Sequence, residues 1–160
     1  MKGEYVALAG RLQRQIADLE HVVDRAEHLV AKAQHRQDDD YLDGVALNLH
    51  GFYTGAERIF EDIARTLDRS LPTGAEWHRD LLVQMSAELG DVRPPVLESR
   101  TRECLEEYRG FRHVVRNVYT FNLHPARLVD LASALRTCYV MLKADIEAFA
   151  TFLMVLSEDG

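Results

Sequence analysis

The chain has 160 residues, of which 47% are hydrophobic and 28% are charged, and its formal net charge is −7. This size and composition predict one folded domain over residues 1–160 and exclude an intrinsically disordered chain. The negative charge excludes a surface that is basic all over, although it leaves room for a local basic site.

Cysteine content and hydropathy indicate the cellular compartment in which the protein is expected. Two cysteines, Cys104 and Cys138, are no disulfide framework in a chain this long, so we expect them to be small core residues in a reducing environment. No signal peptide is visible at the N-terminus. The longest apolar run, Phe152 to Leu156, is far shorter than the roughly 20 residues of a membrane span. We therefore expect a cytoplasmic protein with no membrane partner.

Apolar residues recur in alternating steps of three and four along four segments, which is typical of helices packed side by side at shallow angles. The first segment contains Ala9, Leu12, Ile16, Leu19, Val23, Ala26, Val30 and Ala33. The second contains Leu42, Ala46, Leu49, Tyr53, Ala56, Phe60, Ile63 and Leu67. The third contains Leu97, Thr101, Cys104, Tyr108, Phe111, Val115 and Val118. The fourth contains Leu128, Leu131, Leu135, Cys138 and Leu142 and then, after a one-step phase slip, Ile146, Phe149, Leu153 and Leu156.

Turn-forming residues separate these segments, at 37–40, 70–74, 90–95 and 122–125. Thr73 and Glu76 predict a capping box for a short helix over about residues 74–89. Pro95 and Pro125 suit the first turns of the two helices that follow. Together the segments and breaks predict an all-α fold, an antiparallel up-and-down helical bundle of four long helices plus one short helix.

The densest polar cluster lies on the third long segment. Residues 100–116 contain five arginines and three glutamates, so the charge of this window is opposite to that of the whole chain. Arg112, Arg116 and Tyr119 each follow an apolar seam residue and so form one stripe beside the buried seam. The planar guanidinium group gives bidentate hydrogen bonds to phosphate, so the stripe predicts a phosphate site. The alternative is a set of surface arginines paired with nearby glutamates.

Arg112, Asn117 and Tyr119 occupy the positions of an Arg-x4-His-x-Tyr motif late in a helical bundle. This arrangement resembles the HEPN superfamily, in particular the HepT-like ribonuclease toxins. Segments 49–60 (LHGFYTGAERIF) and 77–82 (WHRDLL) resemble the same subfamily, so the similarity covers most of the chain. The resemblance implies a homodimeric, metal-independent endoribonuclease that cleaves RNA such as tRNA and needs no cofactor. It also implies a partner, a minimal nucleotidyltransferase antitoxin that transfers AMP to the motif tyrosine.

On this resemblance, Arg112 is the motif arginine and Tyr119 is the AMP acceptor. Arg109 and Arg116 are then further candidates for binding RNA phosphate. Asn117 stands where the motif has histidine, and asparagine cannot take up a proton from the attacking 2′-hydroxyl.

Other residues could support or replace the missing histidine. His113, one turn before Asn117, is the first candidate, so the expected catalytic set is Arg112, His113 and Asn117. Glu57 could hold an arginine of the motif helix in position, and His124 could reach the site from the loop. His50 and His78 lie beside apolar seams, where a histidine is more often structural. Losing the acid–base group favours the alternative of a catalytically inactive HEPN-fold binding module that retains RNA or partner binding.

Helical bundles of this kind can also hold a di-iron site, which needs Glu-x-x-His pairs that point into the bundle. No glutamate in the chain has a histidine three residues later, so the sequence predicts no metal site.

Overall fold

The computed structural model describes residues 2–117 and 122–159. Over this part of the chain it contains α1 (Lys2–Arg36), α2 (Tyr41–Ile63), the π-helical turn η1 (Ala64–Asp68), α3 (Trp77–Ser86), α4 (Ser99–Asn117) and α5 (Pro125–Asp159). No β-strand occurs among the described residues. The predicted all-α bundle of four long helices and one short helix is confirmed. None of these helices is long and apolar enough to cross a membrane.

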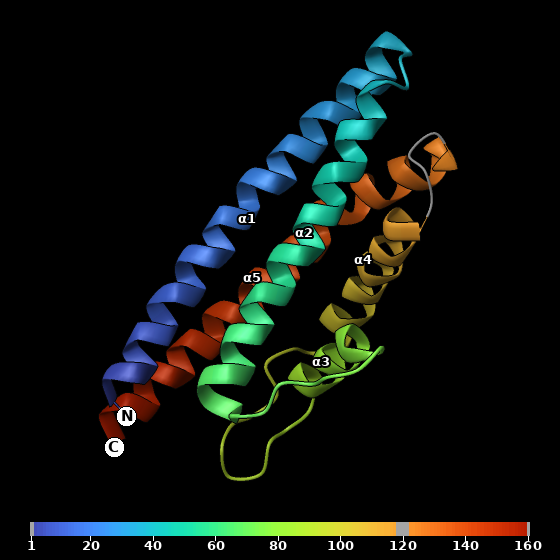
Figure 1. Ribbon diagram of the computed structural model, residues 1–160. Coiled ribbons are helices and arrows are strands. Elements are labelled where there is room, and N and C mark those ends of the chain that lie inside the picture. Colours follow the sequence, from blue (N-terminus) through green and yellow to red (C-terminus); the bar gives the residue numbers. More distant parts are fainter. Residues whose placement is uncertain (1, 118–121, 160) are drawn as a thin grey trace.

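The helices run alternately up and down (Figure 1). α1 and α2 form a long hairpin, and α5 returns along α1, so that both chain ends lie at the same end of the bundle (Figure 1). α4 is shorter, contacts α2 and α5, and diverges from the long hairpin. The short helix α3 packs against α2 and α4 at one end, and this three-helix junction positions the candidate site.

The predicted apolar seams form the core. Every predicted seam residue of the second segment is buried, and so is every one of the fourth except the partly buried Leu156. In α1 every predicted seam residue is buried except Val30, which is partly buried, and the neighbouring Leu29 is buried as well.

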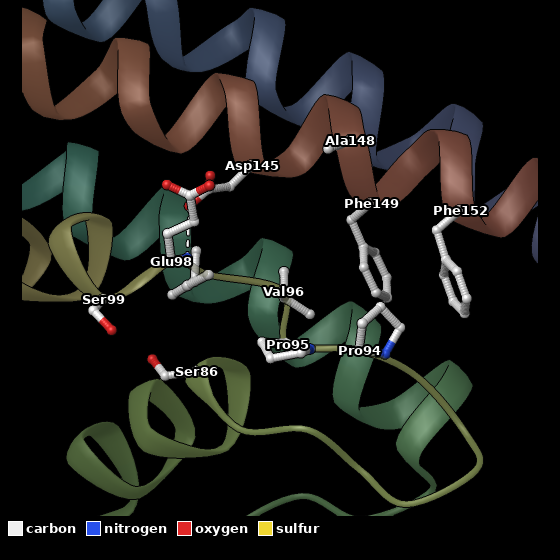
Figure 2. Close-up of a pocket in the computed structure, with 11 residues that line it drawn as sticks. Ser86, Pro94, Pro95, Val96, Glu98, Ser99, Asp145, Ala148, Phe149 and Phe152 are labelled. Atoms are coloured by element: carbon white, nitrogen blue, oxygen red, sulfur yellow. Dashed lines mark hydrogen bonds between the residues drawn. The ribbon is translucent and has the colours of Figure 1, made fainter.

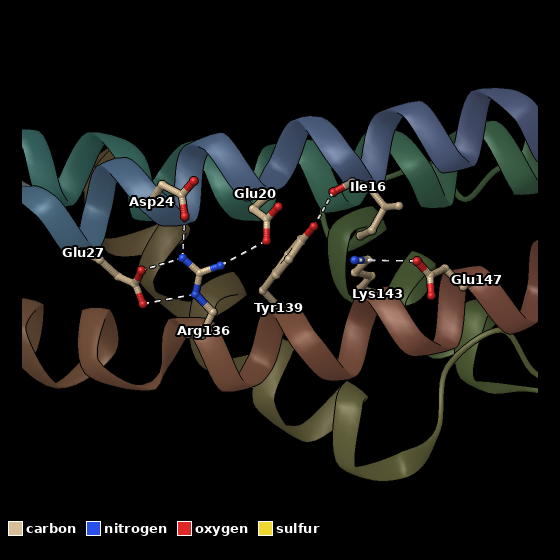
Figure 3. A network of polar contacts seen from close by, with 8 residues as sticks. All are labelled: Ile16, Glu20, Asp24, Glu27, Arg136, Tyr139, Lys143 and Glu147. Atoms are coloured by element: carbon tan, nitrogen blue, oxygen red, sulfur yellow. Dashed lines mark hydrogen bonds and ion pairs between the residues drawn. The ribbon is translucent and has the colours of Figure 1, made fainter.

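Polar contacts tie α1 to α5 along their shared length (Figure 3). The Arg136 guanidinium forms ion pairs with three acidic residues of α1, at 3.3 Å from Glu20 and 2.5 Å from both Asp24 and Glu27. One turn away, the Tyr139 hydroxyl donates a hydrogen bond of 2.8 Å to the carbonyl of Ile16. These contacts fix the register between the two longest helices.

A fully buried ion pair closes the end of the bundle near α3. The Arg93 guanidinium donates to both carboxylate oxygens of Asp68, at 2.6 and 2.8 Å, and both side chains are 0% exposed. Arg93 also donates to the carbonyls of Gln84, Ala87 and Pro94. The pair therefore anchors the loop between α3 and α4 to the π-helical turn that follows α2. The sequence pattern gave no indication of this contact.

Two local predictions about helix ends are wrong, and a third is confirmed. The short helix is Trp77–Ser86, and Glu76 caps it without a side-chain hydrogen bond, so the predicted capping box with Thr73 does not form. Pro95 does not open a helix, because the amides of Val96 and Leu97 bond to the carbonyl of Met85 and α4 begins only at Ser99. Pro125 does occupy the first position of α5, as predicted.

The two cysteines are also not the free thiols that the sequence predicted. Cys104 of α4 and Cys138 of α5 form a disulfide, with Cα atoms 5.8 Å apart. Both had been placed on apolar seams, and the antiparallel packing of α4 on α5 brings these two seam positions opposite each other. Sequence spacing could not show this pairing, because it depends on the register between the two helices.

Candidate functional site

A buried carboxylate joins three helices at the junction of α2, α3 and α4. Glu57 of α2 is 3% exposed, and its Oε2 lies 2.6 Å from Nδ1 of His78 on α3. Its other oxygen, Oε1, lies 3.8 Å from Nε of Arg112 on α4. The structure therefore places Glu57, His78 and Arg112 together, three residues that are 21 or more positions apart in the sequence. We call this group the junction triad.

Electrostatics explain why Glu57 has two polar neighbours. Burial raises the pKa of Glu57 above its ordinary value of 4.5, while the hydrogen bond from His78 and the positive charge of Arg112 act in the opposite direction. A buried carboxylate without such partners would carry a large desolvation cost. His78 and Arg112 thus offset part of the cost of burying the Glu57 carboxylate.

Arg112 is mostly enclosed but not saturated with hydrogen bonds. Its side chain is 15% exposed, and its buried Nε has no hydrogen-bond partner among the described residues. The 3.8 Å separation from Glu57 allows Coulombic attraction but exceeds hydrogen-bond distance. Since guanidinium has five N–H donors, Arg112 keeps donors that could bind an anion entering between α2 and α4.

Two further polar groups of α2 line the same side of the junction. The pKa of His50 is lowered from 6.5 by burial and by the positive charges of Arg112 and Arg116. Burial raises the pKa of the Tyr53 hydroxyl. Within the part of the chain that the structure describes, neither Nδ1 of His50 nor the hydroxyl of Tyr53 has a hydrogen-bond partner, although both atoms are buried. Unsatisfied buried polar atoms are uncommon and cost about 1–3 kcal/mol each, which favours a polar ligand or water beside α2 and α4.

The remaining candidates on α4 lie outside this junction. His113 and Asn117 are exposed, and the Asn117 amide donates to the carbonyl of His113 at 2.7 Å. Asn117 is thus bonded to its own helix. Arg109 forms an ion pair of 2.8 Å with Glu106 on the same helix, as in the surface-pair alternative, whereas Arg116 is exposed.

Two candidates lie at or beyond the C-terminal end of α4. His124 is exposed beside the first residue of α5, and its carbonyl accepts a hydrogen bond from the amide of Leu128. Tyr119 lies outside the described residues. Of the predicted supporting residues, the structure therefore brings His50, Glu57 and His78 to Arg112.

One group of the site, the Tyr53 hydroxyl, is not predicted from the sequence. Tyr53 belongs to a predicted apolar seam, and a tyrosine in a seam gives no sign that its hydroxyl will be left without a hydrogen-bond partner among the described residues.

A separate pocket of about 590 Å³ lies between the 94–99 loop and α5 (Figure 2). It is lined by proline and phenylalanine side chains and by Asp145, which accepts a hydrogen bond from the amide of Glu98 at 3.0 Å. None of the predicted site residues lines it. No group of three or more histidine, cysteine or acidic residues among those described could hold a metal ion.

Comparison with known proteins gives one match. The sequence profile of a family described as HepT-like protein matches residues 44–153, which is more than half of the chain. The chain belongs to the HepT-like family. The matched region of this HepT-like protein includes the whole junction triad, His50 and Asn117, while α1 lies outside it. No curated protein and no solved structure matches the chain.

Proposed function

We propose that this HepT-like protein is the toxin of a toxin–antitoxin pair and acts as a metal-independent endoribonuclease on RNA such as tRNA. The observation that carries the proposal is the position of Arg112. Its guanidinium is held beside the buried Glu57 carboxylate and keeps hydrogen-bond donors for a further anion. An RNA phosphate is the anion that suits this group.

The expected reaction requires stabilisation of negative charge on phosphorus. When the 2′-hydroxyl attacks the neighbouring phosphate, charge builds up on the non-bridging oxygens, and a preorganised guanidinium stabilises it. Arg112 supplies this group in a site with little access to water. The exposed Arg116, one turn further along α4, would bind an adjacent phosphate.

The proposal includes a second copy of the chain and a second protein. Two copies would form a homodimer in which the α4 motifs face one cleft, as the family resemblance implies. A minimal nucleotidyltransferase antitoxin would neutralise the toxin by transferring AMP to Tyr119. An AMP group two residues beyond Asn117 would add negative charge close to the arginine stripe and compete with RNA phosphate.

A binding module without cleavage activity is the second candidate. Asn117 cannot exchange protons, and both Asn117 and His113 are exposed and bonded within α4, away from Glu57. Losing a general acid–base group lowers a rate by about 10²–10⁴-fold. In this reading the protein keeps RNA or partner binding through the arginine stripe.

Incubation of the purified protein with total RNA and tRNA in the presence of EDTA separates the two candidates. The variant Asn117→His is assayed in parallel, and RNA binding is measured on the same samples. Cleavage by the wild type supports the ribonuclease. Binding without cleavage by the wild type, with cleavage restored in Asn117→His, supports the binding module. Absence of both binding and cleavage in the two proteins contradicts the ribonuclease and also contradicts RNA binding by the binding module.

A further inference from the structure

His78 has the geometry of a histidine held for proton transfer. Its Nδ1 is bonded to Glu57 at 2.6 Å, and its ring lies against Trp77 with ring centroids 3.7 Å apart. The side chain is 21% exposed, and its Nε2 makes no hydrogen bond to any described residue. One ring nitrogen is therefore fixed by a carboxylate, while the other remains available to a ligand.

We propose that His78 is the proton-accepting residue of the ribonuclease reaction and that Glu57 is its positioning residue. The inference rests on the function proposed above and names the group that takes the place of the missing motif histidine. A carboxylate bonded to Nδ1 selects the tautomer in which Nδ1 carries the hydrogen and Nε2 has the free lone pair. The same carboxylate stabilises the imidazolium once Nε2 has taken up a proton.

The position of His78 relative to Arg112 supports this role. The two oxygens of Glu57 face the two groups separately, Oε2 toward His78 and Oε1 toward Arg112. Glu57 therefore contacts both the proposed proton acceptor and the proposed phosphate-binding group. Among the described residues, Glu57 of α2 pairs with His78, and Arg112 of α4 faces the other oxygen of that carboxylate.

The other histidines lack this arrangement. His113 and His124 are exposed and have no carboxylate bonded to the ring among the described residues. His50 is close to two arginines that disfavour its protonated form, and its Nδ1 is buried without a partner. Within the described part of the chain, His78 is the histidine whose ring is oriented by a carboxylate, and that carboxylate also faces the motif arginine.

In the proposed step, Nε2 of His78 takes the proton of the RNA 2′-hydroxyl. The 2′-oxygen forms a bond to phosphorus as the bond from phosphorus to the 5′-oxygen breaks, and Arg112 stabilises the charge on the phosphoryl oxygens. The leaving 5′-oxygen takes a proton from water, and His78 then releases its proton to solvent. The products are a 2′,3′-cyclic phosphate and a 5′-hydroxyl end.

The variant His78→Asn tests the step, because the asparagine amide can still donate to Glu57 from about the position of Nδ1 but cannot accept a proton. His21→Asn, which changes an exposed histidine of α1, is the matched control. Cleavage of a synthetic RNA is measured in EDTA, and binding is measured with an analogue whose 2′-hydroxyls are replaced by hydrogen. We expect His78→Asn to lower the cleavage rate by about 10²–10⁴-fold with unchanged binding and melting temperature, and His21→Asn to behave like the wild type.

Cleavage by a folded His78→Asn variant at the wild-type rate overturns the role of His78 but is still consistent with a ribonuclease. A wild-type protein that binds RNA without cleaving it also overturns this role and supports the binding module instead. A wild type that neither binds nor cleaves RNA overturns both proposals. Should His78→Asn not fold, the variant His78→Gln decides, because its amide cannot accept the proton of the 2′-hydroxyl either. A loss of about 10²–10⁴-fold in a folded His78→Gln variant supports the role of His78, and cleavage at the wild-type rate overturns it.

Discussion

Oε2 of Glu57 lies 2.6 Å from Nδ1 of His78, and this short contact joins the middle of the bundle to the short helix α3. The other oxygen of the same carboxylate faces Arg112 on α4. A single side chain on α2 thus determines where the histidine and the arginine of the junction triad lie. The consequences for stability and for RNA binding can be measured separately.

Glu57→Gln should change how stability depends on pH. Burial raises the pKa of Glu57, so the folded state binds a proton that the unfolded state has already released above pH 4.5. The free energy of unfolding of the wild type, relative to that of the Gln variant, should therefore fall as pH rises from 4.5 through the raised pKa. Urea denaturation of both proteins at a series of pH values measures this difference. A difference that stays constant or grows with pH contradicts the prediction.

His50 should titrate below its ordinary pKa of 6.5. Burial is the main cause, and the charges of Arg112 and Arg116 add to it. Removing one charge in Arg116→Ala should raise the pKa of His50, whereas Arg100→Ala, an exposed change on the same helix, should leave it unchanged. NMR titration of the imidazole signals measures these values. An equal shift in both variants would show that the arginine stripe does not act on His50.

Arg93→Met should destabilise the fold strongly. The substitution leaves the Asp68 carboxylate buried without its partner, and breaking a buried pair in this way costs about 3–5 kcal/mol of the free energy of unfolding. Arg100→Met removes a pair whose arginine side chain is 74% exposed, and should change the free energy by less than about 1 kcal/mol. Urea denaturation compares the two, and equal effects would contradict the anchoring role of Arg93.

Breaking the disulfide should destabilise the protein without abolishing the fold. Cys104 and Cys138 are separated by 34 positions, and closing a loop of that size stabilises a folded state by about 3–4 kcal/mol. The double variant Cys104→Ala, Cys138→Ala should lose about this amount in urea denaturation. Mass spectrometry after thiol alkylation should find two reactive thiols only once the protein has been reduced. Two thiols in the non-reduced protein would contradict the pairing.

The fold could be predicted from the sequence because it follows from local periodicity. The apolar residues of α2 and α5 face the core as their spacing indicates, and Pro125 opens α5. The contacts that the sequence did not predict depend on the register between helices. The Asp68–Arg93 pair and the disulfide each join residues that come close only when the helices pack, so no short sequence motif predicts these contacts.

The candidate site could be predicted only in part, for the same reason. Arg112 stands out by its motif, and Glu57 was expected to steady an arginine of the motif helix, which is the contact that the structure contains. The sequence does not predict that His78 contacts Glu57, because this contact depends on how α3 packs against α2. Asn117 occupies the histidine position of the motif and His113 lies one turn before it, yet both are on the exposed side of α4.

If RNA is cleaved at the junction beside Arg112, replacing this arginine should remove most of the activity. Cleavage of tRNA by the wild type, Arg112→Ala and Arg100→Ala is compared in the presence of EDTA, with circular dichroism to establish that all three are folded. We expect cleavage by the wild type and by Arg100→Ala, and a loss of about 10²–10³-fold in Arg112→Ala. Equal cleavage by a folded Arg112→Ala variant would contradict it.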